Sequence, residues 1–297
     1  MSRVTSSRDS RALIAGLGPH GERAAPADLL ALSEQDTDKA RRSRFKVAAI
    51  FHTTKSDWAK QQLAGIVATL GRYAAAVIEV ADCGFRVESQ VEVLRHLRRT
   101  KVDAIISIPV GNGKIAAELL SPHVPAHGTV GILAHGVDFF VTNEREIAFR
   151  KWMGAERADV ILKREKFANL PDAGPATERL LTTNPMLDGL FAVWDEPAIE
   201  AIGVLRTRLK PIPVTTIDLG NAAAVELACG DFIKGIGAQQ PYDQGVAVAT
   251  ATVMALIGNQ PPPWVALPGL AVTASDVVES YQIVWHAPAP AELIKAG

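Results

Sequence analysis

Aromatic, acidic and amide side chains recur where short apolar segments of this chain end. Aromatic rings stack on C–H surfaces, and Asp, Asn and Gln side chains hydrogen-bond to hydroxyl groups. The set has no Arg or Lys cluster of the kind that a phosphate ligand favours, so it indicates an uncharged polyol. The candidate ligand-contacting residues are His52, Ser56, Asp57, Trp58, Phe139, Asn143, Phe167, Trp194, Asp218 and Gln239.

Purely structural roles compete with ligand binding at several of these positions. Asp57, Asn143 and Asp195 each open a predicted helix, where such residues cap the free backbone N–H groups. Trp58 and Trp194 can equally be partly buried packing residues. One residue can also serve both purposes.

The segments that must position these residues alternate regularly between strand and helix patterns. Short apolar runs typical of buried strands begin near positions 47, 77, 104, 130, 160, 190 and 214. Between the first two, Leu63, Ile66, Val67 and Leu70 fall on one helical face. Each interval matches one βα unit of about 30 residues. The pattern predicts an α/β fold with parallel sheets and helices on both faces, and ligands bind beyond the carboxyl ends of such strands.

Composition narrows the class of protein. The chain has 297 residues, a net charge of -1 and two cysteines. That length suits one large or two ordinary domains, and the charge balance argues against a nucleic-acid binder. Two cysteines form neither a disulfide scaffold nor a zinc cluster, and no apolar run reaches the roughly 18 residues of a membrane helix.

The first 44 residues carry several arginines and little periodicity. Their best apolar run, at 12–15, is shorter than the roughly 7–15 residues of a secretory signal. We expect a mobile leader at 1–44 with one weak helix near 27–32.

Five segments together resemble the ribose/galactose-type solute-binding proteins of bacterial ABC importers, which have the type I periplasmic binding protein fold. They are residues 45–58 (FKVAAIFHTTKSDW), 102–109 (VDAIISIP), 190–198 (LFAVWDEPA), 216–220 (TIDLG) and 235–245 (GIGAQQPYDQG). The resemblance spans about residues 45–285 and implies two parallel-sheet lobes joined by a hinge. The first lobe would comprise 45–110 plus 240–268, and the second 111–239 plus 269–297.

The resemblance also implies roles for single residues. Trp58 matches the aromatic residue that stacks on the sugar, and His52 and Ser56 match polar contacts of the first lobe. Asn143 matches a position that is often Arg, and Trp194 a position where an amide is common. Asp218 and Gln239 match the acid and amide contacts of the second lobe and hinge. The changes at 143 and 194 indicate a ligand other than ribose.

One departure concerns the first lobe. After 105–109, residues 110–117 already look like the first helix of the second lobe, so about one βαβ unit of roughly 30 residues is missing. In the family, this missing unit carries an acid–Arg pair that binds the ligand. The expected consequence is a shortened sheet with an exposed edge.

Other motifs have weaker functional interpretations. The G-x-G-x-x-G match at 16–21 contains Pro19 and lacks a preceding strand, so it does not predict a dinucleotide site. His123, His127 and His135 lie close together in the sequence, but Pro122 and Pro125 break any helical metal-ligand spacing, so a loop or hinge role is expected for them rather than a metal site. The basic run of Arg95, His96, Arg98, Arg99 and Lys101 is typical of a solvated helix end.

The resulting hypothesis is a sugar- or polyol-binding component of an ABC importer that is not an enzyme and needs no cofactor or metal. Its expected partners are the sugar and the importer permease, not nucleic acid, and we expect a monomer. The resemblance implies the periplasm, although without a convincing signal peptide the cytoplasm stays open. The alternatives are a ligand-sensing core related to lactose-repressor-type regulators, an α/β enzyme, and a degenerate remnant that binds nothing.

Overall fold

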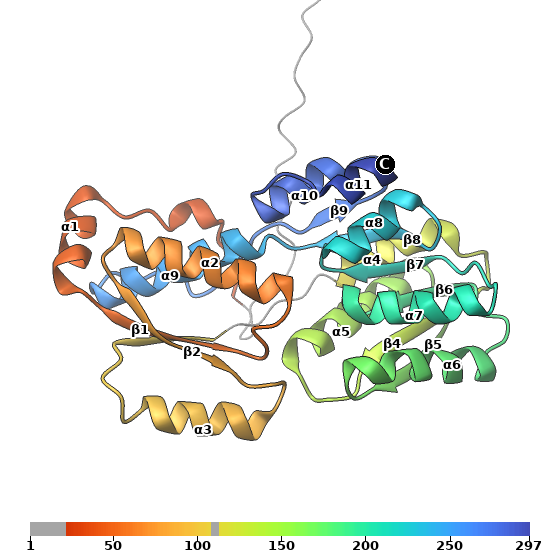
Figure 1. Cartoon of the computed structure of the whole chain (residues 1–297), viewed down its shortest axis with the longest axis horizontal. Coiled ribbons are helices and arrows are strands. Elements are labelled where there is room, and N and C mark those ends of the chain that lie inside the picture. The colour runs from red at the N-terminus through yellow and green to blue at the C-terminus, as the bar shows by residue number, and fades with distance from the viewer. Residues whose placement is uncertain (1–21, 108–112) are drawn as a thin grey trace, which may run out of the picture.

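The computed structural model describes residues 22–107 and 113–297 and arranges them as two α/β lobes side by side (Figure 1). The first lobe holds a parallel sheet in the order β2-β1-β3. Its strands are β1 (Lys46–Phe51), β2 (Ala76–Asp82) and β3 (Ala104–Ser107). Lys46 pairs with Ala76 and Val47 with Ala104, so all three strands begin at the same end of the sheet.

Helices cover both faces of this sheet because β1 is apolar on both sides. Val47, Ala49 and Phe51 pack toward α2 (Asp57–Arg72) and α9 (Pro241–Leu256). Ala48 and Ile50 pack toward α3 (Val87–Leu97) on the opposite face. A strand buried on both faces is apolar at nearly every position, which explains why the run at 46–51 is continuous rather than alternating.

The first sheet leaves β3 as an edge strand in the described part of the chain. Beside it, Val91 and Leu94 of α3 are 37% and 42% exposed, and Ile105 of β3 is 39% exposed. Gln90 of α3 contacts Ser107 of β3, which places this helix flank next to the edge. Val67, expected on the buried face of α2, is also 49% exposed.

The expected leader contains more structure than the sequence predicts. The weak helix expected near 27–32 is a single 3-10 turn, Ala27–Leu29. The prediction of a mobile leader is wrong for residues 34–43, which form the regular helix α1 (Glu34–Ser43). The side chain of its N-cap residue, Ser33, accepts a hydrogen bond from the Asp36 backbone N–H. Ala40 is fully buried in the first-lobe core, and Lys39 Nζ donates to the Ile257 carbonyl at the end of α9. A polar helix with one buried alanine has almost no apolar periodicity, so the sequence pattern misses it. The G-x-G-x-x-G match at 16–21 lies outside the described residues.

The second lobe holds a six-stranded sheet in the order β5-β4-β6-β7-β8-β9, parallel except for the antiparallel β8–β9 pair. Its strands are β4 (Thr129–His135), β5 (Ile161–Phe167), β6 (Gly189–Ala192), β7 (Val214–Ile217), β8 (Ile233–Ala238) and β9 (Leu270–Val272). The strand count differs from the expected pattern, because Gly-rich β8 and three-residue β9 carry weak strand signals.

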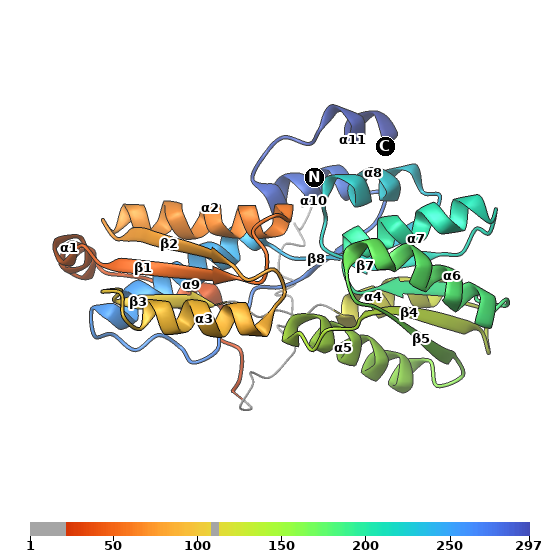
Figure 2. The same ribbon diagram turned by 60° about the horizontal axis from the view of Figure 1, so that its bottom comes forward.

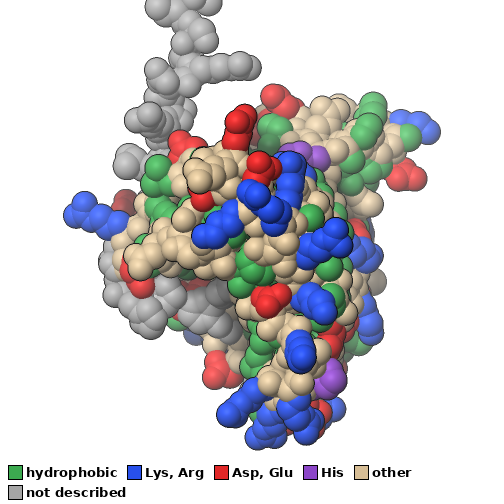
Figure 3. All heavy atoms as spheres, turned by 90° about the vertical axis from the view of Figure 1, so that its left-hand side faces the viewer, with side chains coloured by type: hydrophobic (Ala, Val, Ile, Leu, Met, Phe, Trp, Pro, Cys, Tyr) green, Lys and Arg blue, Asp and Glu red, His purple; other side chains and the backbone are tan. Residues whose placement is uncertain are grey.

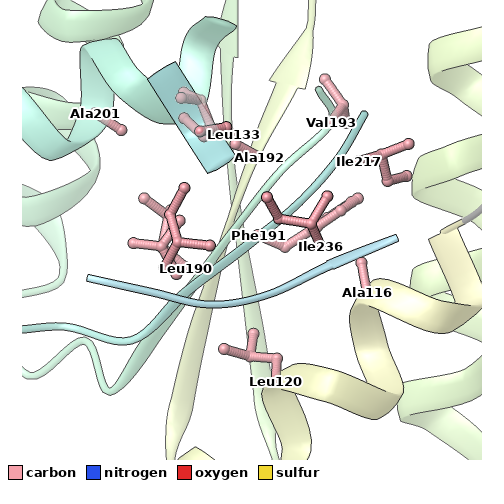
Figure 4. Close-up of a cluster of buried hydrophobic side chains, with 14 of the residues drawn as sticks. Ala116, Leu120, Leu133, Leu190, Phe191, Ala192, Val193, Ala201, Ile217 and Ile236 are labelled. Carbon is pink, nitrogen blue, oxygen red and sulfur yellow. The ribbon is translucent and has the colours of Figure 1, made fainter. Parts of the chain in front are cut away.

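Helices sandwich this second sheet. On one face lie α4 (Gly113–Leu120) and α5 (Phe140–Glu156), and on the other α6 (Ala173–Thr183), α7 (Asp195–Thr207) and α8 (Asn221–Cys229). Figure 4 shows the core between the layers, with Ala116 and Leu120 of α4 on one side of the strands and Ala201 of α7 on the other. The C-terminal helices α10 (Val277–Trp285) and α11 (Ala291–Ala296) pack against α8 (Figure 2).

Segments of the chain cross between the lobes after β8 and again between α9 and β9. The sequence-based lobe boundaries stay a prediction, and residues 110 and 111 lie outside the described ranges. Within those ranges, no helix is both long enough and apolar enough to cross a bilayer.

Candidate functional site

A cavity of about 330 Å³ lies between the lobes, beyond the carboxyl ends of β1, β6 and β7. That size is within the range of small-molecule sites, about 300–1,000 Å³. Both lobes contribute to its walls, so strands far apart in sequence meet at one place. Eight of the predicted residues line it: His52, Ser56, Asp57, Trp58, Phe139, Trp194, Asp218 and Gln239.

Trp58 is held in the cavity wall by the start of α2. Ser56 is the N-cap of this helix and accepts a hydrogen bond from the Ala59 backbone N–H, so Asp57 and Trp58 occupy its first turn. The indole Nε1 of Trp58 donates to Gln239 Oε1 at 2.8 Å. This bond joins α2 to the residue that follows β8 and orients the amide of Gln239.

Aromatic rings from both lobes meet at the cavity. The His52 ring of the first lobe lies 4.8 Å from the Phe139 ring of the second, measured between centroids. Phe85, in the loop after β2, lies 5.8 Å from Phe139 edge-on and is stacked 6.4 Å from Trp194. Burial lowers the pKa of His52 to about 4, so the imidazole is neutral at pH 7 and adds no charge to this contact.

Arg145 and Asp218 form a buried ion pair in the second-lobe wall. Arg145 Nη1 and Nη2 donate to the two carboxylate oxygens of Asp218 at 2.9 and 3.2 Å, and Nη1 also donates to the Val193 carbonyl. Their side chains are 5% and 12% exposed. Because the guanidinium charge is already matched by Asp218, Arg145 offers hydrogen bonds rather than a free positive charge.

Asp195 is a second buried carboxyl in the same wall. It opens α7, and its carboxylate accepts backbone N–H groups from Glu196 at 3.0 Å and Gly220 at 2.9 Å. Burial, together with the charge of neighbouring Asp218, raises the pKa of Asp195 to about 7.

This shift predicts a pH-dependent stability. The pKa of Asp195 is about 7 in the folded protein and about 3.9 in the unfolded chain, so the folded state binds more protons between these values. The contribution of Asp195 to the free energy of unfolding should therefore fall as pH rises from about 4 to about 7, whereas His52, whose pKa is lowered to about 4, contributes a rise over the same range. In urea unfolding across this range, the free energy of unfolding of Asp195→Asn relative to that of the parent protein should therefore increase as pH rises. An exposed-site control, Glu292→Gln, should keep the parent slope, and equal slopes in all three proteins would contradict the prediction.

Two buried donors in the cavity wall lack a partner among the described residues: Arg145 Nε and Gln239 Nε2. A buried donor without an acceptor costs free energy, so such groups favour a ligand that brings oxygen acceptors. The aromatic walls favour a ligand that also has apolar C–H faces. The arrangement can therefore bind a hydroxylated, uncharged small molecule.

Two predicted residues do not line the cavity. Asn143 donates to Asp138 Oδ1 at 2.6 Å and lies in the first turn of α5, which starts at Phe140 rather than at 143. Phe167 is 1% exposed in the second-lobe core, where its ring lies 5.2 Å from the Trp194 ring. Neither side chain lies in the cavity wall, so their contact with a ligand stays a prediction, and Phe167 instead packs against Trp194. His135, placed in a loop by the sequence, ends β4 with its ring 5.3 Å from Trp194.

The sequence-based list missed several residues of the cavity, among them Arg145, Phe85 and Asp195. Arg145 was overlooked because it lies two residues, or about 200°, from Asn143 around α5, and the sequence does not show which of the two faces the cavity. Phe85 has a φ of 59° in a loop that carries no pattern. Asp195 was noted only as a helix opener, and its contact with Gly220 joins residues 25 positions apart.

Comparisons with known proteins agree with this architecture. A family model described as a periplasmic binding protein domain matches residues 109–260. No curated protein matches the chain significantly.

Many solved structures share the fold. A carbohydrate transporter solute-binding protein from Agrobacterium radiobacter, in complex with D-arabinose, has a TM-score of 0.73 at 17% identity, covering 82% of this chain and 99% of its own. An ABC transporter solute-binding protein from Agrobacterium vitis with bound allitol has a TM-score of 0.70 at 17% identity, and the match covers 80% of this chain and 98% of that protein. An ABC transporter solute-binding protein from Actinobacillus succinogenes 130z with bound D-allose has a TM-score of 0.68 at 20% identity, and the match covers 78% of this chain and 99% of that protein. At these identities the similarity establishes the fold, a two-lobed type I periplasmic binding protein.

Proposed function

Because this chain belongs to the periplasmic binding protein domain family, we propose that it binds a small neutral sugar or polyol between its two lobes, as the substrate-binding component of an ABC importer. The observation that carries the proposal is the cavity between the lobes, whose walls combine stacked aromatic rings with two buried, unpartnered donors. D-arabinose, allitol and D-allose, bound by proteins of the same fold, have the same chemistry of hydroxyl groups on a C–H skeleton.

The proposed contacts follow from the geometry of the wall. Trp58 stacks on the C–H face of the ligand, while Arg145 Nε and Gln239 Nε2 donate to its oxygens. Asp218 accepts hydroxyl donors while it holds Arg145. Binding involves no covalent step, so the protein acts as a binding protein and not as an enzyme.

Closure of the lobes around the ligand is the signal that a permease would read. We propose that the protein works as a monomer in the periplasm and delivers its ligand to the permease of an importer. Light scattering should give a single-chain mass. Cell fractionation should recover the protein with periplasmic markers, and recovery with the cytoplasm would contradict the proposed location.

Isothermal titration calorimetry with a panel of pentoses, hexoses and linear polyols tests the binding proposal. We expect saturable heat with at least one member and a matching rise in Tm, because a ligand that binds only the folded state stabilises it. If no member of the panel gives heat or a Tm shift with the unaltered protein, the proposed function is wrong.

Replacing Trp58 with alanine should weaken this binding by about a hundredfold, since it removes both the stacking face and the hydrogen bond that orients Gln239. Trp58→Phe keeps an aromatic ring and should therefore lose less affinity than Trp58→Ala. Trp264→Ala, outside the cavity wall, is the matched control and should bind like the parent. Equal affinities for Trp58→Ala and the parent would exclude Trp58 from the ligand site.

A further inference from the structure

The basic run at the end of α3 becomes part of a larger surface once the chain is folded. The helices α1, α2 and α3 each end just before a strand of the first sheet, and the three strands are parallel and in register at their starts. The three helix ends therefore meet at the amino end of the sheet, opposite the cavity. We call this surface the basic pole. It comprises Arg41, Arg42, Arg44, Lys46, Arg72, Arg95, Arg98, Arg99 and Lys101.

Contacts between the elements support this convergence. Arg41 Nε, at the end of α1, donates to the Arg72 carbonyl at the end of α2, 3.1 Å away. The Lys46 backbone N–H, at the start of β1, donates to the Asp103 carboxylate just before β3. Figure 3 faces this end of the first lobe and shows Lys and Arg side chains spread over it and gathered at its lower end.

The cations of the pole are not neutralised within the protein. All are exposed, and none forms an ion pair with a described residue. In the second lobe, by contrast, Arg150, Arg157, Arg164, Arg179, Arg206 and Arg208 each pair with a carboxylate. Acids near the pole are few: Asp38 on α1, Glu79 beside His96, Glu92 one turn before Arg95 on α3, and Asp103.

A surface of unpaired cations attracts an anionic partner, and three features favour an anionic phospholipid bilayer. The pole presents helix C-termini, which offer no backbone N–H cradle for a single phosphate, so the attraction rests on flexible side chains. Phe45 and Tyr73, the aromatic residues nearest the pole, are half-buried in the core, whereas single-stranded nucleic acid is bound by exposed stacking rings. Leu94 and Ile105, beside the basic run, are exposed apolar side chains that can enter a headgroup layer.

We propose that the basic pole holds the protein against an anionic lipid surface while the cavity, at the other end of the first sheet, stays accessible. This interaction is independent of the sugar site and needs no ligand.

Co-sedimentation with phosphatidylcholine vesicles containing phosphatidylglycerol tests the proposal. The full chain should bind at low salt, should not bind vesicles of phosphatidylcholine alone, and should be released at about 1 M salt, where the Debye length is about 3 Å. The triple variant Arg98→Glu, Arg99→Glu, Lys101→Glu should bind about a hundredfold more weakly, since each cation near such a surface contributes to the attraction. Arg41→Glu, Arg42→Glu, Arg44→Glu, on a different helix, should show a similar loss.

The matched control changes the net charge equally at exposed lysines of the second lobe: Lys151→Glu, Lys163→Glu, Lys166→Glu. It should bind vesicles like the parent, and circular dichroism should show that all three variants are folded. An equal loss in the control, or no binding by the parent at low salt, would overturn the proposal. So would tighter binding of the pole to duplex DNA than to vesicles, which would make nucleic acid the partner.

Discussion

Replacing Arg145 with methionine should lower the free energy of unfolding by about 3–5 kcal/mol and abolish ligand binding. The substitution removes the guanidinium that donates to both carboxylate oxygens of Asp218. It leaves that carboxylate, 12% exposed and close to buried Asp195, without a compensating charge. Urea unfolding followed by circular dichroism measures the loss of stability, and calorimetry with the sugar panel measures the loss of binding.

Two further variants separate the ion pair from simple loss of packing. Adding Asp218→Asn to the Arg145→Met protein should recover part of the lost stability, because it removes the stranded charge. Arg179→Met breaks the exposed pair with Glu165, in which Arg179 is 54% exposed, and should cost only about 0–1 kcal/mol. A loss below about 1 kcal/mol in Arg145→Met would show that the pair is not needed for folding.

Replacing Gly65 with valine should destabilise the first lobe by about 4 kcal/mol or more. The backbones of α2 and α9 are in contact where the two helices cross. A Cβ atom at Gly65 would lie 2.2 Å from the carbonyl oxygen of Tyr242, and a Cβ atom at Gly245 would lie 2.3 Å from the carbonyl oxygen of Gln62. A side chain at either position must push the helices apart, which opens the core that they form with β1. Thermal and urea unfolding measure the effect.

Gly71, near the end of the same helix, is the matched control. A Cβ there would meet nothing within 4 Å, so Gly71→Ala should be neutral or should stabilise the protein by up to about 1 kcal/mol. If Gly65→Val were tolerated as well as Gly71→Ala, the close packing of α2 on α9 would be wrong.

Much of the architecture could be predicted from local patterns. The continuous apolar run at 46–51 and the period of about 30 residues depend only on neighbours along the chain, so the parallel α/β fold follows from them. Because parallel strands share a carboxyl end, the residues that follow them converge, as His52, Trp58, Trp194 and Asp218 do at the cavity. Short or polar elements escaped prediction for the same reason: α1 and β9 have almost no apolar periodicity.

Long-range contacts decided the rest. A helix turns by about 100° per residue, so Asn143 and Arg145 of α5 point about 200° apart, and only the packing of the helix decides that Arg145 is the one that lines the cavity. Likewise, the run at 95–101 is an ordinary helix end along the chain. It becomes a charged surface only because parallel strand pairing places three helix ends together, and pairing joins residues whose separation no local pattern specifies.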